Sequence, residues 1–304
     1  MTLKQLEAFY WAATCSSFLV AADRLHLSLS SLSKRISELE TALGVELFDR
    51  SGHKAVLTSA GDLLLPRAQS LIREADDIEQ QLKQAQGLRG LCRFGVGELT
   101  ALTWLPVLIS NVRVAHPALR LEPAVEAGSS LGGLAQRVSD GSLDFAIVAS
   151  RSPRENIRLR PVGQVELCWV IGTSPGAPPK SLTSKVIDGL PLITLPVGSG
   201  TAATVDACLE ANELEPASRL LCNSWPVVAS LIADGMGFGL LPMGWAVTLE
   251  KRGKVHMLKT KSSPTPLQYF FLSRRDDHRP LLQEMLRLFE TSIDFNRTGI
   301  WLGG

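Results

Sequence analysis

Apolar residues recur at helical spacing in the first sixty residues of this 304-residue chain. From residue 29 onward they fall at steps of four, three and four, at Leu32, Ile36, Leu39 and Leu43. Such a series predicts a helix with one buried face. Ser17 can cap a shorter helix over residues 18–25, because its hydroxyl accepts from the free N–H groups of a first turn. Residues 26–28 then form the joint of a helix-turn-helix, and Gly52 places the turn of a short wing.

The polar face of the second helix suggests contact with DNA. It is short, polar and cationic at one end, as expected of a helix that meets base edges in the major groove while Lys and Arg hold phosphates. The candidates on this helix are Leu29, Ser30, Ser33, Lys34 and Arg35. In the wing, Arg50 and Lys54 are expected at phosphates and His53 in the neighbouring minor groove, the alternative being a solvated loop.

Residues 59–90 carry the most regular pattern of the chain. Apolar positions alternate steps of four and three at Leu64, Ala68, Leu71, Ala75, Ile78, Leu82 and Ala85. A heptad seam of this kind requires a partner helix. Thr58 or Ser59 is expected to cap this helix, with Asp62 completing a capping box from Ser59, and Pro66 is expected to bend it. Glutamines and glycines near its end predict a hinge.

From residue 91 strands and helices alternate, which predicts an α/β domain with parallel sheets covered by helices. The first set has strands at residues 93–97, 119–126 and 143–148 and helices at residues 105–115 and 131–140. The second has strands at residues 165–171, 190–195, 220–223 and 237–241 and helices at residues 202–211 and 226–234. A strand at residues 267–273 and a helix at residues 280–292 complete the chain.

Composition limits the possible partners and compartments. The net charge is +1, and residues 1–58 hold six basic and six acidic residues, so DNA binding depends on where the cations lie. Five scattered cysteines without a CxxC pair argue against a disulfide framework or a zinc site. No signal-peptide layout opens the chain, and no apolar run approaches the roughly 20 residues of a membrane helix. We expect a cytoplasmic protein without a membrane partner.

Motifs for enzymatic chemistry are weak. Gly235, Gly237 and Gly239 lead into an apolar strand rather than opening a helix, so they do not fit a dinucleotide fingerprint. The run from Gly198 to Gly200 lacks the spacing of a nucleophile elbow, and the five histidines lie in unrelated stretches. We therefore expect neither an enzyme nor a cofactor.

Polar residues gather instead where predicted strands give way to helices. They are Thr100, Thr103, Ser129, Ser130, Ser199, Gly200 and Thr201. In open α/β sheets these junctions face a crevice, and helix N-termini offer N–H groups to an anion. No Arg or Lys lies among them, which favours a single carboxylate or sulfonate over a phosphate ester. Trp225 and Trp104 are candidates for a flat apolar wall, and the alternatives are helix caps and core tryptophans.

The chain resembles the LysR-type transcriptional regulators. In the first sixty residues the resemblance rests on Leu3, Leu6, Phe9, Ser17-Phe18, Ala21-Ala22, Leu25, Ser28, Ser33, Ile36, Leu39-Glu40, Leu43-Gly44, Leu47-Phe48, Arg50 and Leu57-Thr58-x-Ala60-Gly61. Further along, the matches are Leu105-Pro106, Gly141-x-Leu143-Asp144 and the glycine-rich run from Asp234 to Pro242. One position departs: Leu29 stands where the family usually has Gln, and leucine can touch a thymine methyl but cannot form a hydrogen bond.

The resemblance implies three parts: a winged helix-turn-helix over residues 1–58, a dimerisation helix and hinge over 59–90, and an effector domain over 91–304. This last part would resemble periplasmic binding proteins, with lobe I at about 91–162 and 266–295 and lobe II at about 163–265. Double-stranded DNA, RNA polymerase, a small effector between the lobes, and a homodimer that pairs into a tetramer are also implied.

We therefore predict a transcription regulator switched by a small organic anion, an aromatic carboxylate or sulfonate. Such a switch requires the effector to bind one arrangement of the lobes more tightly than another. The competing hypothesis, a solute-binding protein of periplasmic type, predicts a signal peptide and no heptad seam.

Overall fold

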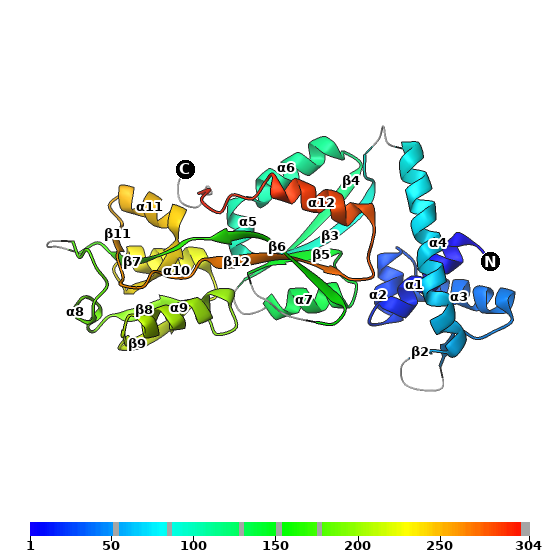
Figure 1. Cartoon of the computed structure of the whole chain (residues 1–304), viewed down its shortest axis with the longest axis horizontal. Coiled ribbons are helices and arrows are strands. Elements are labelled where there is room, and N and C mark those ends of the chain that lie inside the picture. Colours follow the sequence, from blue (N-terminus) through cyan, green and yellow to red (C-terminus); the bar gives the residue numbers. More distant parts are fainter. Residues whose placement is uncertain (51–54, 84–86, 128–130, 150–153, 175–177, 299–304) are drawn as a thin grey trace.

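The computed structural model describes residues 1–50, 55–83, 87–127, 131–149, 154–174 and 178–298. Three parts follow one another along its longest axis (Figure 1). A helical N-terminal part lies at one end, a first α/β lobe lies in the middle, and a second α/β lobe lies at the other end.

The N-terminal part is a winged helix-turn-helix. Its elements are α1 (Leu3–Thr14), α2 (Phe18–Arg24), α3 (Leu29–Leu43), β1 (Phe48–Asp49) and β2 (Val56–Leu57). Ser17 caps α2 as predicted, its Oγ accepting from the N–H of Val20 at 3.2 Å. His26 takes a left-handed backbone conformation (φ 54°) that ends α2 and starts the joint. Of the predicted apolar face, Leu32, Ile36 and Leu39 are fully buried in the core formed with α1, whereas Leu43, the last helical residue, is 38% exposed.

Helix α4 (Ser59–Lys83) carries the predicted heptad seam, whose residues differ in burial along the helix. Its cap is Thr58, whose Oγ1 accepts from the N–H of Gly61 at 3.1 Å. Near its start the helix packs on α1 and buries Ala68. Further along, Leu71 and Ile78 are 49% and 51% exposed. Within one chain, therefore, Ala68 of the seam is covered while Leu71 and Ile78 are not; the Leu82 side chain and Ala85 lie outside what the structure describes.

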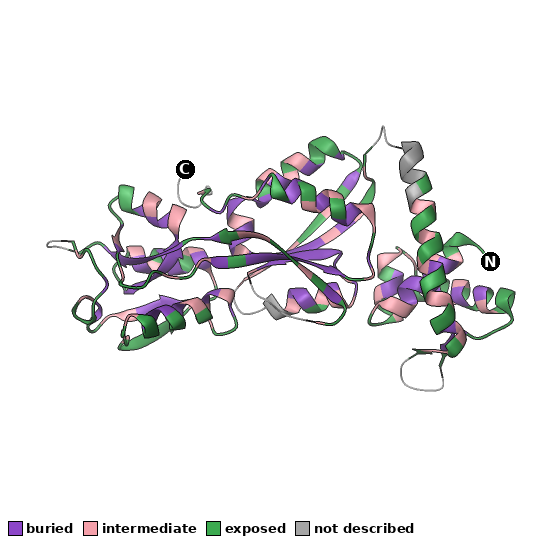
Figure 2. Ribbon diagram, in the orientation of Figure 1, coloured by how far each residue is buried: buried purple, intermediate pink, exposed green. Residues whose placement is uncertain are grey.

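Lobe I is built on a five-stranded sheet in the order β4-β3-β5-β12-β6. Its strands are β3 (Gly90–Gly97), β4 (Leu119–Glu126), β5 (Phe145–Val148), β6 (Ile157–Val165) and β12 (Leu267–Arg274). Helices α6 (Leu105–Ala115) and α12 (Pro280–Glu290) lie on one side of the sheet and α7 (Leu131–Ser139) on the other, while α5 (Glu98–Thr103) follows β3 (Figure 1). The strands at the centre of the sheet are almost wholly buried (Figure 2).

Lobe II has a second five-stranded sheet in the order β11-β7-β10-β8-β9. Its strands are β7 (Leu167–Gly172), β8 (Pro191–Thr194), β9 (Ser218–Leu221), β10 (Phe238–Pro242) and β11 (Val255–Leu258). Its helices are α8 (Ser184–Ile187), α9 (Gly200–Ala211), α10 (Trp225–Ala233) and α11 (Met243–Lys251). The chain passes from the first sheet to the second at Glu166, between β6 and β7, and returns between β11 and β12.

The expectation of purely parallel sheets was wrong. Strands β3, β4 and β5 pair in parallel, but β12 pairs antiparallel with β5 and β6, and β7 pairs antiparallel with β10 and β11. The reason is the two crossovers, which return the chain to each sheet from the opposite direction. Strand β6 was not predicted. It contains Pro161, which is tolerated here because β6 is an edge strand.

Candidate DNA-binding and effector sites

The start of α3 is presented to solvent. Ser28 caps the helix, with its Oγ accepting from the N–H of Ser31 at 3.1 Å and lying 2.9 Å from the Oγ of Ser30. Leu29, the first helical residue, is 47% exposed, and Ser30 is also exposed. A helix N-terminus that carries hydroxyl groups and one apolar side chain can approach base edges in a major groove.

The cations of α3 lie beside this start. The Lys34 side chain is 79% exposed, and its Nζ lies 4.0 Å from Glu38, a weak pair that leaves the ammonium group accessible. Ser33 and Arg35 are half-buried at the flanks of the face. These positions match the predicted arrangement, in which residues at the N-terminal end point outward and a cation follows them.

Glu40 fixes the beginning of the wing. Its Oε1 accepts from the N–H groups of Leu47 and Phe48 at 2.9 and 3.2 Å, and its Oε2 accepts from Nη2 of Arg50 at 3.0 Å. The Arg50 side chain nevertheless remains 45% exposed. The other two wing candidates, His53 and Lys54, lie outside the described residues.

Between the lobes lies a cavity of about 30 Å³. Its lining consists of Gly97, Glu98, Leu99, Glu126, Ala149, Leu195, Ser199, Gly200, Thr201, Trp225, Leu267 and Tyr269. Four predicted ligand residues are therefore brought together, Ser199, Gly200 and Thr201 at the start of α9 and Trp225 at the start of α10. The lobes touch closely, since a Cβ on Gly200 would come within 2.6 Å of the carbonyl oxygen of Ala149.

Other predicted ligand residues do not line this cavity. Thr103 donates its hydroxyl to the carbonyl oxygen of Leu99 at 2.7 Å, so it is bonded within its own helix. Of the two interpretations of Trp104, a wall of the site or a core tryptophan, the second is confirmed: it packs edge-on against Phe289 and Phe295 in the core of lobe I. Ser129 and Ser130 lie outside the described residues.

Three buried oxygen atoms have no hydrogen-bond partner in the part of the chain that the structure describes; two belong to residues that line the cavity, and the third belongs to Thr100, which follows the lining residue Leu99. They are Thr100 Oγ1, Ser199 Oγ and Glu126 Oε2. Burial raises the pKa of Glu126, although Arg137 opposes this shift. A buried polar atom without a partner costs on the order of 1–3 kcal/mol, which favours any group that supplies the missing hydrogen bond.

Glu98 was missed in the sequence, although it directly follows a strand of lobe I. Its carboxylate reaches across to lobe II, where Oε1 accepts from the hydroxyl of Ser224 at 2.9 Å and Oε2 from the N–H of Trp225 at 2.7 Å. It therefore occupies the N-terminus of α10. Its position after the first predicted strand was the one available signal, the same signal that selected Thr100.

The fold and these two sites define a class: a winged helix-turn-helix joined through a long helix to a two-lobed domain with a cleft. Residues 3–62 match the bacterial regulatory helix-turn-helix protein of the lysR family, and residues 85–293 match the LysR substrate binding domain. The chain belongs to the LysR family of transcriptional regulators, and it is a DNA-binding protein of that type.

Individual relatives agree with this assignment. The HTH-type transcriptional regulator YybE of Bacillus subtilis is 30% identical over 80% of this chain and 82% of its own. A full-length OxyR variant from Pseudomonas aeruginosa superposes with a TM-score of 0.63 at 21% identity, covering 97% of this chain and 96% of its own. CbnR, a LysR family regulator, gives a TM-score of 0.54 at 18% identity and covers 95% and 100%. These two structures support the fold alone.

Membrane-spanning helices and metal sites are both absent from the described residues. None of the helices there is both long and apolar enough to cross a bilayer. No group of His, Cys, Asp and Glu in those ranges has the arrangement of a metal site.

Proposed function

We propose that this regulator is switched by a small organic anion, a carboxylate or sulfonate with an apolar body, bound between the two lobes. The observation that carries the proposal is a pair of buried oxygen atoms without a partner among the described residues: Ser199 Oγ, at the start of α9 in the cleft, and Thr100 Oγ1, within α5. Hydroxyl groups and helix N-termini together form a donor set for an acid group. Trp225 and Tyr269 supply apolar surface beside them.

Glu98 supports the choice of an acid. The N-terminus of α10 and the Ser224 hydroxyl already hold one carboxylate, that of Glu98. An acid group entering the cleft would compete for the same donors. Because a cavity of about 30 Å³ holds little more than water, while ligand pockets are typically 300 Å³ or more, the lobes must separate for an effector to enter.

On the DNA side, we propose that Leu29, Ser30 and Lys34 meet base edges or the adjacent phosphates, with Arg50 on the phosphate backbone. Ser33 and Arg35 support the flanks of this surface, and the wing residues His53 and Lys54 extend it. Such a protein acts in the cytoplasm, where the DNA and RNA polymerase are found. We propose that it alters the access of polymerase to a promoter by changing the spacing of its DNA-binding domains.

We propose that the exposed part of α4 pairs with the same helix of a second copy. Leu71 and Ile78 are seven residues apart and both about half exposed, as expected of one side of a heptad seam that lacks its partner. Two such dimers would form the tetramer. Replacing Leu71 and Ile78 together by Asp would then give monomers in light scattering, whereas a dimer of unchanged mass would exclude this seam.

A thermal-shift screen tests the effector proposal. Wild type and Ser199→Ala would be exposed to a panel of aromatic and aliphatic acids and, separately, amines of matched size. A ligand at about a hundred times its Kd adds roughly 2.7 kcal/mol to stability, which is readily measured. We expect some acids to stabilise the wild type and the Ser199→Ala variant to bind them about tenfold more weakly. Stabilisation by amines alone would contradict the proposal and point to Glu98 and Glu126 as the ligand-binding groups.

A mobility-shift titration tests the DNA surface. Arg50→Ala should weaken binding by a similar factor on any sequence and reduce the dependence of log K on log salt by about 0.9, because one phosphate contact is lost. Lys34→Ala should also reduce the preference for the operator over unrelated DNA. If both variants bind like wild type, the DNA surface has been assigned to the wrong residues.

A further inference from the structure

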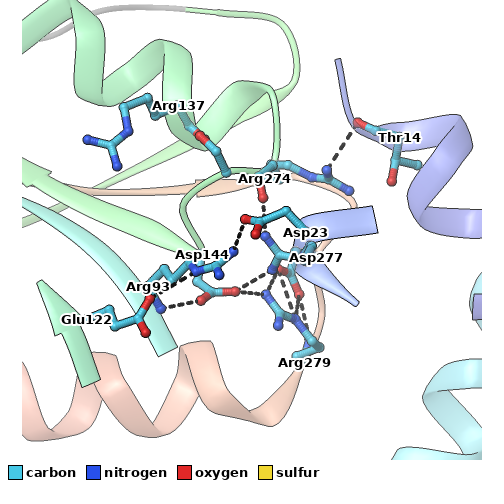
Figure 3. A network of polar contacts seen from close by, with 12 residues as sticks. Thr14, Asp23, Arg93, Glu122, Arg137, Asp144, Arg274, Asp277 and Arg279 are labelled. Atoms are coloured by element: carbon cyan, nitrogen blue, oxygen red, sulfur yellow. Dashed lines mark hydrogen bonds and ion pairs between the residues drawn. The ribbon is translucent and has the colours of Figure 1, made fainter. Parts of the chain in front are cut away.

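A network of buried ion pairs joins the DNA-binding domain to lobe I (Figure 3). Arg24, the last residue of α2, donates to the carboxylate of Asp144 and to the carbonyl oxygen of Gly141. Arg279 donates to the same Asp144 oxygen at 2.5 Å and to Asp277 at 2.6 Å. The other oxygen of Asp144 accepts from the backbone N–H of Arg93 at 2.7 Å. We call this set of residues the interdomain clamp.

Helix α1 adds a second set of contacts to the clamp. Trp11 lies under three guanidinium groups, those of Arg24, Arg274 and Arg279, at 4.0, 5.3 and 5.4 Å from its ring centroid. Arg274 also donates to the carbonyl oxygen of Thr14 at 3.1 Å (Figure 3). The second residue after α1 contributes a direct backbone contact, because the N–H of Ser16 donates to the carbonyl oxygen of Asp140 at 3.2 Å.

The clamp is buried, yet the two domains do not share an apolar core. The side chains of Arg24 and Asp144 are only 10% and 5% exposed. Burial alone would raise the pKa of Asp144, but Arg279 and Arg24 hold it below the usual range. The apolar cluster of the DNA-binding domain is separate from those of the lobes, and a cavity of about 250 Å³ lies at the boundary. Polar contacts therefore hold the domains together.

Three central strands of lobe I connect this clamp to the cleft between the lobes. Strand β5 starts directly after Asp144 and ends directly before Ala149, which lines the cleft cavity. Strand β3 carries Arg93 in its first half and leads to Glu98 directly after its last residue, and β12 runs from the cleft residue Leu267 to Arg274. Their centres are tied by stacked rings, since Phe145 lies 5.1 Å from Phe94 and 4.8 Å from Phe271.

We infer that the interdomain clamp is a second connection between effector domain and DNA-binding domain, in addition to helix α4 and its hinge. It fixes the orientation of α2, and so of the recognition helix, on lobe I. The strands of lobe I would carry a change at the cleft to the clamp, a part of the inference that rests on the proposed effector site. Coupling of this kind requires that the clamp has two states with different populations when the cleft changes.

Hydrogen exchange on the full-length protein tests the clamp without any effector. Arg24→Ala removes the DNA-binding domain's half of the buried pair. We expect about tenfold faster exchange in the segment carrying the Ser16 amide and in two lobe I segments, residues 140–144 and 276–279. Arg24→Lys should restore part of the protection. Asp23→Ala is the matched control: Asp23 is the neighbouring residue and its ion pair with the Arg93 side chain also crosses the domain boundary, but the Asp23 side chain is 70% exposed, so loss of this pair should have little effect.

The outcomes separate a clamp from a local role of Arg24 in folding. If exchange rises only within α1 to α3, Arg24 merely stabilises its own domain and the clamp is excluded. If Arg24→Ala and Asp23→Ala both exchange like wild type, the domains are not held by this network. Faster exchange in lobe I, with Asp23→Ala unchanged, supports the clamp.

A second variant tests transmission from the cleft. Glu98→Ala removes the bonds from lobe I to Ser224 and Trp225 on lobe II, and it does not touch the clamp. Transmission predicts at least a twofold change of exchange in residues 140–144 and 276–279. A change confined to the cleft segments would overturn transmission while leaving the clamp in place. Neither experiment depends on the effector being an anion, so failure of the proposed function would be seen separately in the ligand screen.

Discussion

The two ends of the lobe I sheet both bury polar side chains, but these side chains differ in whether they have hydrogen-bond partners. At the end near the DNA-binding domain, Asp144 and Asp277 are almost fully buried, and their carboxylates are bonded to Arg279 and, for Asp144, also to the Arg93 N–H. At the cleft end, Thr100 and Ser199 are equally covered, yet their hydroxyl groups have no partner among the described residues. The same sheet thus has one completed polar end and one incomplete end.

Unpaired and paired buried polar groups have different consequences for the free energy of the protein. Unpaired buried oxygen atoms cost free energy in every state where nothing binds them, so a structure that retains them favours whatever supplies the missing donor or acceptor. Paired buried charges contribute little net stability over apolar residues, but they are costly to break. We therefore expect substitutions at the clamp to act on stability and substitutions at the cleft to act mainly on binding.

The largest effect is expected from Asp144→Ala. This change removes the shared acceptor of Arg24, Arg279 and the Arg93 N–H and leaves buried cationic groups without it. Breaking a buried ion pair from one side typically costs about 3–5 kcal/mol. Urea denaturation followed by circular dichroism would measure the loss.

Asp206→Ala provides the control for that measurement. Asp206 also pairs with an arginine, Arg219, at 2.6 Å, but both side chains are about half exposed. An exposed pair is worth about 1 kcal/mol or less. If Asp144→Ala lowers the free energy of unfolding no more than Asp206→Ala, the ion pairs of Asp144 do not contribute as buried pairs.

Acid should weaken the clamp end within a defined range. Although burial opposes it, the bonds from Arg279 lower the pKa of Asp277 from 3.8 to about 2. A carboxyl whose pKa is lower in the folded protein stabilises it above its unfolded pKa, and this contribution is lost as the pH falls from about 4 towards 2. At about 1.4 kcal/mol per pKa unit, the loss is on the order of 2 kcal/mol. Asp277→Asn should flatten the pH dependence of urea unfolding between pH 5 and pH 2, and an equally steep dependence in this variant would refute the assignment.

Glu98→Ala should have a smaller effect on stability, because its partners are only partly buried. It removes two hydrogen bonds to a carboxylate but leaves Ser224 and the α10 N-terminus in a position that water can reach. We expect a loss of about 1–2 kcal/mol. Small-angle scattering should show a more open pair of lobes, and unchanged scattering together with unchanged stability would mean that Glu98 does not hold the lobes together.

Much of the fold could be predicted because it is encoded locally. The steps of four and three from Leu32 to Leu43 predicted α3, and the residue ranges of β4 and α6 were predicted without error. The directions of β7, β10 and β12 were not predicted, because strand direction depends on crossovers far apart in sequence.

The candidate sites were predicted less completely for a similar reason. Asp144 belonged to a run that resembled the family, but its partners Arg24 and Arg279 lie 120 and 135 residues away in the sequence. No local pattern joins them. From residue type alone, Thr100 and Thr103 were equal candidates. In the structure the Thr103 hydroxyl donates to a carbonyl oxygen, whereas the Thr100 hydroxyl has no partner among the described residues.

That pair of threonines gives the smallest and sharpest test of the contrast. Both lie in α5 and both are fully buried, at 0% and 1% exposure, so replacing either by valine removes one hydroxyl and keeps the shape. Thr103→Val loses a 2.7 Å bond to the carbonyl oxygen of Leu99 and should destabilise by about 0.5–1 kcal/mol. Thr100→Val removes an oxygen that has no partner in the described structure, so stability should stay the same or rise by up to about 1 kcal/mol. Thermal unfolding of both variants measures the difference. If Thr100→Val lowers stability as much as Thr103→Val, ordered water already satisfies the hydroxyl, and the cleft end is as complete as the clamp end.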